Sequence, residues 1–419
     1  MDGFSAPKSK GAIDPWGLPL EGLDPSRAEL FQDGSHLEFF KRLRQESPVH
    51  YTPKSQFGAF WSITRFHDIM AVDTNHQVFS SDRDIVIGDN PEGFAPLNFI
   101  AMDPPKHDVQ RRAATPAVSP RRLQDLEVLI RQRVCAILDS LPVGETFNWV
   151  DRVSIELTTQ MLATLFDFPW EDRHLLPFWS DVVTASETVG VAVDMAQRER
   201  TLMECLSYFT TLWHERAAAE PQFDFISLLA HNPDTKDMVN DPMEFLGNLI
   251  LLIVGGNDTT RNSISGGVLA LNQFPGEYDK LKADPSLIPN MISEIIRWQT
   301  PLAHMRRTAT QDIEFQGQQI RKGDRVVMWY ISGNRDDEVI ERADEFIIDR
   351  DRARQHLSFG FGIHRCMGNR VAEMQLRILW EEIMARFERV EVVGEPVRLA
   401  NNFVLGYTDL PVRLTAKAG

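Results

Sequence analysis

The sequence predicts a mainly helical protein of the α+β class with small peripheral β-sheets. Apolar residues recur every three or four positions through most of the 419 residues, which is typical of helices with one buried face. Leu126, Ile130, Val134, Ile137 and Leu141 show this spacing clearly. Strand signals, which are β-branched and aromatic residues beside turn residues, are assigned only before residue 65 and after residue 312. We therefore expect a helical body with sheets at its edges.

The elements are expected in the following order. A Pro- and Gly-rich start precedes a short helix at 37–44, and a strand pair at 49–51 and 60–64 flanks a Pro/Gly/Ser turn. Apolar spacing predicts helices at 126–141, 154–165, 197–219, 242–273, 289–300 and 367–387. The late strands are expected at 313–315, 325–330, 390–392 and 412–414, the last two as a pair.

Charge and cysteine content exclude several classes of protein. With 44 basic and 60 acidic residues the net charge is −16, which argues against general nucleic-acid binding. The three cysteines, Cys135, Cys205 and Cys366, show no C-x-x-C spacing, so neither a disulfide framework nor a zinc site is expected. The longest apolar run, 249–254, is too short to span a membrane, and no secretory signal follows Met1. These features favour a cytoplasmic protein with no membrane segment.

A glycine-rich loop around Cys366 is the most informative motif. It reads Phe-Gly-Phe-Gly-Ile-His-Arg-Cys-Met-Gly over 359–368 and directly precedes the last long helix. Its glycines let the backbone approach a planar ligand, and a helix N-terminus favours a thiolate, so we expect Cys366 to be easily deprotonated. A cysteine thiolate can be the axial ligand of haem iron, although a lone cysteine is more often a buried structural residue.

The ten-residue pattern resembles the cysteine-ligand loop of the cytochrome P450 family, the haem-thiolate monooxygenases. The resemblance implies haem b as cofactor, Cys366 as its metal ligand, and Phe359 and Gly368 as residues that contact it. It also implies the family's fold, a single triangular helical body with a central oxygen-binding helix.

A second motif, Gly255-Gly256-Asn257-Asp258-Thr259-Thr260, lies inside the predicted helix at 242–273. Two glycines in a helix interior cost about 1 kcal/mol each relative to alanine, so a locally strained helix or a close helix crossing is expected. In the resembled family this pattern forms the oxygen-binding groove. The resemblance implies that Gly255 and Gly256 make room for dioxygen and that Asp258 and Thr259 are catalytic and relay protons.

Two further sets of residues fit the same resemblance. Glu294 and Arg297, at i and i+3 on a helix, are similar to the family's structural E-x-x-R pair. Its usual third partner is left unassigned, because Glu345 stands where an arginine is commonest. The implied haem-propionate ligands are His107, Arg111, Arg307 and His364, whereas Arg112 and Arg306 are expected to be solvated surface charges.

These motifs extend over most of the chain, from His107 to Cys366, and no repeat or linker separates them. The length alone would suggest two or three domains. Because one site draws on so much of the sequence, we expect a single haem-thiolate monooxygenase domain at 37–419, preceded by an N-terminal extension at 1–36.

The resemblance implies a monooxygenase that uses O2, two electrons and two protons, releases water and inserts one oxygen atom into an unactivated C–H bond. Peroxide-using members lack the acid-alcohol pair, so Asp258 and Thr259 favour a separate electron donor. The expected donor is a ferredoxin served by an NAD(P)H-dependent ferredoxin reductase. It would be steered to a basic patch formed by Arg111, Arg112, Arg121, Arg122, Arg354, Arg365 and Arg370.

The substrate is expected to be small and apolar. Segments that line the pocket in the resembled fold correspond to 85–99, 184–193, the helix near Leu252, 302–305 and 403–405. The candidate pocket residues are Ile87, Phe94, Leu97, Leu252, Leu302, Val404 and Leu405. They include no partner for a charged head group, which favours hydrocarbons over acids.

Residues 255–263 and 356–370 together resemble the alkane-hydroxylating bacterial branch of the family. This resemblance implies terminal hydroxylation of medium-chain n-alkanes. Individual members of that branch also take fatty acids, so a fatty-acid ω-hydroxylase is the alternative. A haem-thiolate protein that binds a ligand without activating oxygen remains a third possibility, although it would not need Asp258 and Thr259.

Overall fold

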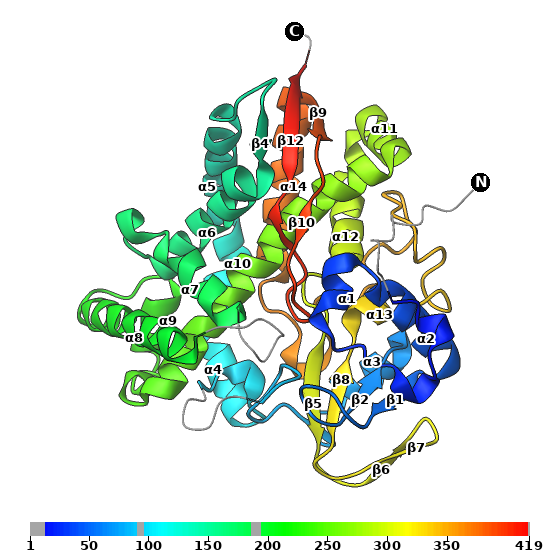
Figure 1. Ribbon diagram of the computed structural model, residues 1–419. Helices are drawn as coiled ribbons and strands as arrows, with labels where there is room; N and C mark the ends of the chain where they lie inside the picture. The colour runs from blue at the N-terminus through cyan, green and yellow to red at the C-terminus, as the bar shows by residue number, and fades with distance from the viewer. Residues whose placement is uncertain (1–12, 90–95, 186–193, 418–419) are drawn as a thin grey trace.

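The computed structural model describes residues 13–89, 96–185 and 194–417. Long helices surround one central helix, α10, and small sheets lie at the edges of this body (Figure 1). The mainly α architecture with small peripheral sheets is therefore confirmed. No described helix combines the length and apolar character that crossing a membrane requires.

The helices of the described residues vary from one turn to 32 residues. The α-helices are α1 Ala28–Asp33, α2 His36–Glu46, α3 Phe66–Thr74, α4 Lys106–Ala114, α5 Pro120–Asp139, α6 Glu156–Phe166, α7 Leu175–Thr184, α8 Met195–Ala218, α9 Phe225–His231, α10 Pro242–Gln273, α11 Pro275–Ala283, α12 Ile288–Gln299, α13 Tyr330–Gly333 and α14 Asn369–Arg386. The short helical turns are η1 Pro15–Gly17, η2 Leu20–Gly22, η3 Phe99–Ala101, η4 Thr115–Val118, η5 Val150–Ile155, η6 Trp170–Asp172, η8 Met238–Asn240, η9 Pro285–Leu287 and η10 Gly362–His364.

Helix α10 begins and ends where the sequence analysis predicts, at residues 242 and 273. Asp241 caps its start by accepting a hydrogen bond from the Glu244 amide at 3.2 Å, and Pro242 occupies the first turn, where its missing N–H costs nothing. The helix packs against α6, α7, α8, α12 and α14. Because it has neighbours on nearly every side, most of its side chains are buried.

The described strands form four sheets. The largest has the order β1-β2-β8-β5-β3, antiparallel except for β2 and β8, and it lies beside the helical body near α1 and α2 (Figure 1). Its strands are β1 Val49–Thr52, β2 Phe60–Ile63, β8 Arg325–Met328, β5 Met305–Ala309 and β3 Phe79–Ser80. The smaller sheets are β4 Thr146–Asn148 with β12 Pro411–Ala416 and β9 Phe387–Val392, β6 Ile313–Phe315 with β7 Gln318–Ile320, and β10 Val397–Arg398 with β11 Tyr407–Asp409.

The predicted strand pairs are found in this arrangement. β1 pairs with β2 in an antiparallel register, Val49 opposite Ile63, and β9 pairs with β12, Val392 opposite Val412. Strand 325–330 ends earlier than predicted, at Met328, because Tyr330 already starts α13. The sequence analysis missed β5, which pairs with β8, because its two arginines break the alternation of apolar and polar residues.

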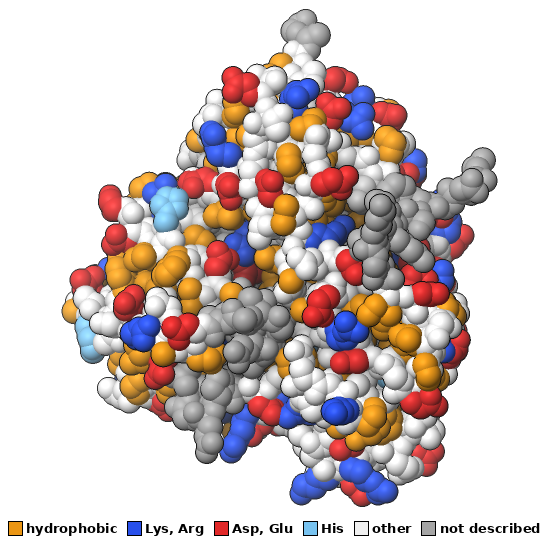
Figure 2. All heavy atoms as spheres, in the orientation of Figure 1, with side chains coloured by type: hydrophobic (Ala, Val, Ile, Leu, Met, Phe, Trp, Pro, Cys, Tyr) orange, Lys and Arg blue, Asp and Glu red, His pale blue; other side chains and the backbone are white. Residues whose placement is uncertain are grey.

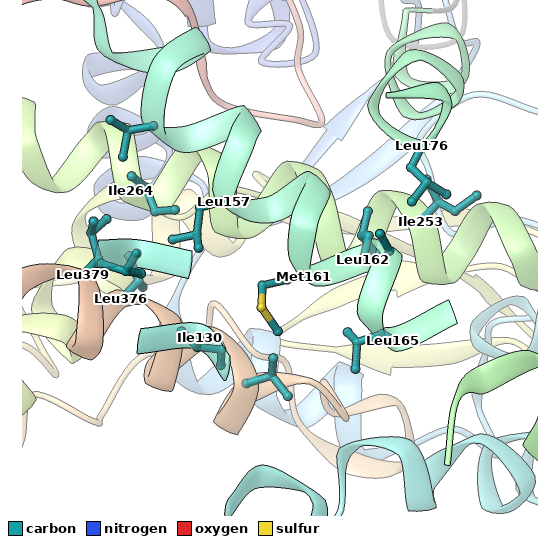
Figure 3. Close-up of a cluster of buried hydrophobic side chains, with 14 of the residues drawn as sticks. Ile130, Leu157, Met161, Leu162, Leu165, Leu176, Ile253, Ile264, Leu376 and Leu379 are labelled. Carbon is teal, nitrogen blue, oxygen red and sulfur yellow. The ribbon is translucent and has the colours of Figure 1, made fainter. Parts of the chain in front are cut away.

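The main core lies where α5, α6, α10 and α14 meet. In Figure 3, Ile130 and Leu157 lie beside Leu376 and Leu379. Met161 lies between this group and Leu165. These side chains come from α5, α6 and α14, and Ile253 and Ile264 of α10 belong to the same cluster. Their burial fixes the position of α10 relative to the loop that precedes α14.

The described part of the N-terminal extension also packs on the body. Phe31 of α1 stacks on Trp329 with ring centroids 6.0 Å apart, and Leu23 and Leu30 join the same buried cluster. Figure 2 shows acidic and basic side chains interspersed over one face of the molecule, with hydrophobic ones gathered over α7 and α8.

Candidate active site

Cys366 lies in the turn between η10 and α14. Its amide donates a hydrogen bond to the Phe359 carbonyl at 2.8 Å, which closes the loop on itself. Gly360 and Gly362 have φ angles of +64° and +63°, a region that favours glycine. A Cβ at Gly362 would lie 2.6 Å from the Asp73 carbonyl oxygen, so this position has no room for a side chain.

The Cys366 side chain faces a cavity of about 350 Å³ that also reaches α6, α8 and α10. Burial raises the pKa of the Cys366 thiol, while the amides of Gly368 and Asn369 and the Arg111 guanidinium act in the opposite direction. The expectation of an easily deprotonated cysteine is therefore wrong for the protein groups alone, because burial outweighs the donors. The donors nevertheless converge on the sulfur and suit a metal-bound thiolate.

Helix α10 forms the wall of the cavity that carries the second motif. Gly255 lines the cavity, and a Cβ there would meet no heavy atom within 4 Å. At Gly256 a Cβ would lie 2.7 Å from Leu162 Cδ2, so its missing side chain also lets α6 pack closely. Thr259 lines the cavity and its hydroxyl donates to the Gly255 carbonyl at 2.8 Å. The helix is continuous through this motif, so the expected local strain is not seen, and the Thr259 hydroxyl bonds the backbone one turn earlier.

Asp258 does not line the cavity and is fully buried behind Thr259, on the side of α10 that faces α7. Its carboxylate pairs with Arg261 at 2.6 Å and accepts a hydrogen bond from the Ser180 hydroxyl at 3.2 Å. Arg261 also pairs with Asp181 at 3.0 Å, and the Asp181 side chain is 56% exposed. Burial raises the pKa of Asp258 to about 6, although Arg261 lowers it. A chain of polar groups thus runs from the surface to the inner carboxylate.

The predicted propionate ligands gather at one end of the cavity. Arg111, Arg307 and His364 line it, and His107 lies behind His364 with ring centroids 4.5 Å apart. Burial and the nearby Arg307 lower the pKa of His364 to about 2, so this imidazole is neutral. Arg307 already holds Asp73, at 2.8 Å between Nη2 and Oδ1.

Arg306 requires a correction. It is expected to be a solvated surface charge, but only 6% of it is exposed. Its guanidinium donates to the Gly88 carbonyl at 3.1 Å and pairs with Asp89 at 2.8 Å. Arg306 therefore ties the segment before residue 90 to β5. Arg112 is exposed on α4, as expected.

The Glu294 and Arg297 pair is bidentate, with both hydrogen bonds 2.7 Å long and both side chains fully buried. The third partner is Arg350, whose Nε lies 3.1 Å from Glu294 Oε2. It lies five positions after Glu345, so the structure assigns the partner that the sequence analysis leaves open. Glu345 contributes only its carbonyl, which accepts from both Arg297 and Arg350 at 2.9 Å.

Some of the substrate-pocket candidates line the cavity, and others pack elsewhere. Leu252 and Leu302 lie on the cavity wall. Ile87 and Leu405 instead pack in the cluster around Phe31 and Trp329, Val404 packs with Phe403 and bridges to Leu302, and Leu97 lies against Gly247 of α10. These four placements are corrections, because side chains next to each other along an extended segment face opposite sides. Phe94 lies outside the described residues.

Sequence reasoning missed three polar groups at this site. Arg350 was indistinguishable from a surface arginine by local pattern, because its partner Glu294 lies on another element. Arg261 follows Asp258 by three positions on α10, a spacing that could have indicated this pair, whereas its second partner Asp181 lies on α7. Arg198, near the start of α8, lines the cavity. Its only signal was a basic residue shortly after the segment 184–193, which was expected to line the pocket.

The residues present fit a haem group. The Nε2 atom of His107 and the Nδ1 atom of His364 are buried without a hydrogen-bond partner among the described residues. Polar atoms buried in this way generally have a partner, and a propionate carboxylate would supply one. Cys366 with two amide donors faces the same cavity. This combination defines a site for a cysteine-ligated haem beneath an oxygen-binding helix.

Comparison with known proteins agrees with a cysteine-ligated haem protein. The family model for cytochrome P450 matches residues 125–413. The chain is 35% identical to linalool 8-monooxygenase of Pseudomonas putida over 95% of this chain and 100% of the relative. It is 30% identical to a methyl-branched lipid omega-hydroxylase of Mycobacterium tuberculosis, over 96% and 93% of the two chains.

Among solved structures, cytochrome P450-153 from Novosphingobium aromaticivorans is 47% identical, with a TM-score of 0.88, over 96% of this chain and 100% of that one. The chain belongs to the cytochrome P450 family. It is a haem b monooxygenase that uses O2 and electrons from redox partners.

Proposed function

We propose that this monooxygenase hydroxylates the terminal carbon of medium-chain n-alkanes. The observation that carries the proposal is the apolar cavity between α10 and Cys366. Ile250, Leu251, Leu252, Val254 and Leu302 contribute hydrophobic side chains to its wall. An aliphatic chain gains free energy by leaving water for such a wall, and it needs no polar partner there.

Similar proteins support an aliphatic substrate. One relative is named for omega-hydroxylation of methyl-branched lipids and another for monooxygenation of linalool. The motifs at 255–263 and 356–370 resemble the alkane-hydroxylating branch. The overall reaction would convert R–CH3, O2, two electrons and two protons into R–CH2OH and water.

The residues of this chain have separate tasks in the proposal. Cys366 would ligate the iron, and Phe359 and Gly368, which line the cavity beside it, would contact the ring. Arg111, Arg307, His107 and His364 would hold the propionates. The haem supplies the oxygen-activating chemistry when it is bound.

Proton delivery would use the polar chain on α10. The Thr259 hydroxyl faces the cavity, and Asp258 lies behind it. Because the pKa of Asp258 is raised to about 6, its carboxyl can both take up and release a proton near neutral pH. Asp181 and Arg261 connect it to the surface.

Electrons would come from a ferredoxin and its NAD(P)H-dependent reductase. Arg112, Arg121, Arg365 and Arg370 are exposed on α4, on α5, in the cysteine loop and on α14. In contrast, Arg354 and Arg122 have acidic neighbours, Glu373 at 3.5 Å and Asp125 at 3.8 Å. Four exposed cations around the cysteine loop would attract an acidic ferredoxin despite the negative net charge.

The test is turnover of the haem-loaded enzyme with a ferredoxin, its reductase, NADH and n-dodecane. The proposal expects dodecan-1-ol as the main product, identified by gas chromatography against standards. Oxidation mainly at internal carbons would contradict the terminal assignment. The absence of any alcohol, with the same redox proteins supporting NADH oxidation, would contradict the substrate class.

A further inference from the structure

Arg198 is a cation on the cavity wall with no ion-pair partner among the described residues. It is partly buried near the start of α8, and its Nε atom is buried without a hydrogen bond there. Burial lowers the pKa of its guanidinium, and no described carboxylate counteracts this. An arginine stays charged even so, which leaves a charge that lacks compensation.

The other arginines of the cavity wall have partners. Arg307 pairs with Asp73 at 2.8 Å, Arg83 lies 3.8 Å from Asp82, and Arg111 donates to the Arg365 carbonyl. Arg111 and Arg307 also belong to the proposed propionate set. Arg198 lies on a different element from all of them and has no such task.

The described residues that line the cavity include four arginines and His364 but no aspartate or glutamate. This imbalance is unusual in an acidic protein with 60 carboxylate side chains. A haem would bring two carboxylates to Arg111, Arg307 and the histidines. Arg198 therefore remains a site for a third carboxylate, in a cavity that is otherwise apolar.

We propose that Arg198 binds the carboxylate of a linear fatty acid whose hydrocarbon chain occupies the apolar cavity. This inference rests on the proposed function, because it uses the same cavity and the same terminal oxidation. It makes Arg198 a specificity-determining residue: an anchored head group leaves the far methyl end to reach the space between Gly255 and Cys366. The reaction is the same insertion of one oxygen atom from O2, so the product is an ω-hydroxy fatty acid.

Arginine is suited to this task. Its planar fork donates two parallel hydrogen bonds to a carboxylate, and the apolar surroundings strengthen each bond. A neutral chain of the same length gains nothing from the guanidinium. The structure thus predicts discrimination between an acid and its ester, and this discrimination should depend on one side chain.

The experiment is an optical titration of the haem-loaded ferric enzyme with dodecanoate, methyl dodecanoate and n-dodecane. The variants are Arg198→Gln, Arg198→Lys and Arg200→Gln. Arg200 is the matched control, because it is exposed on the same helix and bonds Gln197 at 3.0 Å. Haem content and the carbon monoxide spectrum of each variant establish that it is folded.

In the wild type we expect dodecanoate to bind more tightly than its methyl ester. Arg198→Gln should weaken dodecanoate binding about 10- to 100-fold, which corresponds to loss of a charged hydrogen bond. It should leave methyl dodecanoate and dodecane within about twofold. Arg198→Lys should recover part of the affinity, because it keeps the charge, and Arg200→Gln should change nothing.

Equal dodecanoate affinity in the wild type and Arg198→Gln would overturn the anchor, as would equal weakening for acid and ester. Failure of the proposed function looks different: then neither dodecane nor methyl dodecanoate shifts the wild-type spectrum. Binding of dodecane with no dependence of dodecanoate on Arg198 would leave the alkane proposal intact and remove only this inference.

Discussion

Thr259 and Asp258 are neighbours in the sequence but face different surroundings. Thr259 lines the cavity, whereas Asp258 is buried against α7 beside Ser180 and Arg261. Adjacent positions on a helix point about 100° apart, which produces this division. This division suits the roles proposed above, in which the Thr259 hydroxyl would act on the cavity side and Asp258 would pass protons inward from the surface.

We predict that Thr259→Ala keeps NADH oxidation but diverts it from alcohol to hydrogen peroxide. The variant loses the hydroxyl that faces the cavity, so the proposed delivery of protons through Thr259 is disrupted and reduced oxygen is released as peroxide. Thr211→Ala is the control, since its hydroxyl bonds the Ser207 carbonyl in the same way at 3.2 Å but lies exposed on α8. The measurement is alcohol and peroxide formed per NADH. Unchanged alcohol yield in Thr259→Ala would remove its proposed role.

The Asp258 carboxyl gives stability a defined pH dependence. Its pKa is raised from 3.8 to about 6, so the folded protein holds this proton more tightly than the unfolded chain does. The associated stabilisation is present at low pH and is lost as pH rises through the window from 3.8 to about 6. Asp258→Asn has no carboxyl at this position and therefore lacks this pH-dependent contribution to the free energy of unfolding. Its stability relative to wild type should therefore rise with pH across that window, by up to about 1.4 kcal/mol per unit.

The measurement is denaturant unfolding of the haem-loaded wild type and Asp258→Asn at several pH values. Parallel curves through this window would show that Asp258 titrates at its ordinary pKa. A variant that loses relative stability with rising pH would reverse the sign and contradict the argument.

At the scale of elements, the sequence predicted α10 to the residue but not its surroundings. Apolar spacing alone predicted its extent, and the structure adds Asp241 as the cap of its first turn. The contacts that position it come from distant residues: Leu162 of α6 opposite Gly256, and Ser180 of α7 opposite Asp258. A local pattern carries no information about such pairings, so the neighbours could be found only in three dimensions.

The cysteine loop shows the same limit. Its motif identified Cys366 and the implied ligands, because it combines unusual residues at fixed spacing. Arg350 was missed because it reaches Glu294 from 56 residues away and no local pattern distinguishes it. Arg306 was misjudged because its partner Asp89 lies 217 positions upstream. Side-chain direction in the described segments at 85–89, 96–98 and 403–405 was equally beyond the sequence.

The Glu294, Arg297 and Arg350 cluster holds α12 to the segment before the cysteine loop. We predict that Arg350→Gln lowers the free energy of unfolding by about 3–5 kcal/mol, because it leaves a buried carboxylate with fewer partners. Arg321→Gln, which breaks a pair with both side chains more than half exposed, should cost less than about 1 kcal/mol. The measurement is denaturant unfolding of the haem-loaded enzymes. Equal effects of the two substitutions would contradict the structural role of Arg350.

At the scale of the whole molecule, positive charge is concentrated near the cysteine loop although the net charge is negative. The net charge is −16, yet Arg112 and Arg365 are exposed close to the cysteine loop. We predict that Arg112→Glu with Arg365→Glu slows electron transfer from an acidic ferredoxin about tenfold or more at low salt and weakens its salt dependence. Lys54→Glu is a control of the same kind at an exposed position before β2. Stopped-flow reduction in carbon monoxide is the measurement, and an unchanged rate would remove this docking surface.

Both the proposed hydroxylation and the proposed role of Arg198 require a cavity that accepts an aliphatic chain above Cys366. The most direct measurement is an optical titration of the haem-loaded ferric enzyme with n-dodecane. We predict a saturable shift of the Soret band toward the high-spin form, because the chain displaces water from the site. The same titration of Leu302→Arg, which places a charge on the apolar wall, should give little or no shift. A wild-type spectrum that dodecane leaves unchanged would contradict an aliphatic-chain site in this cavity.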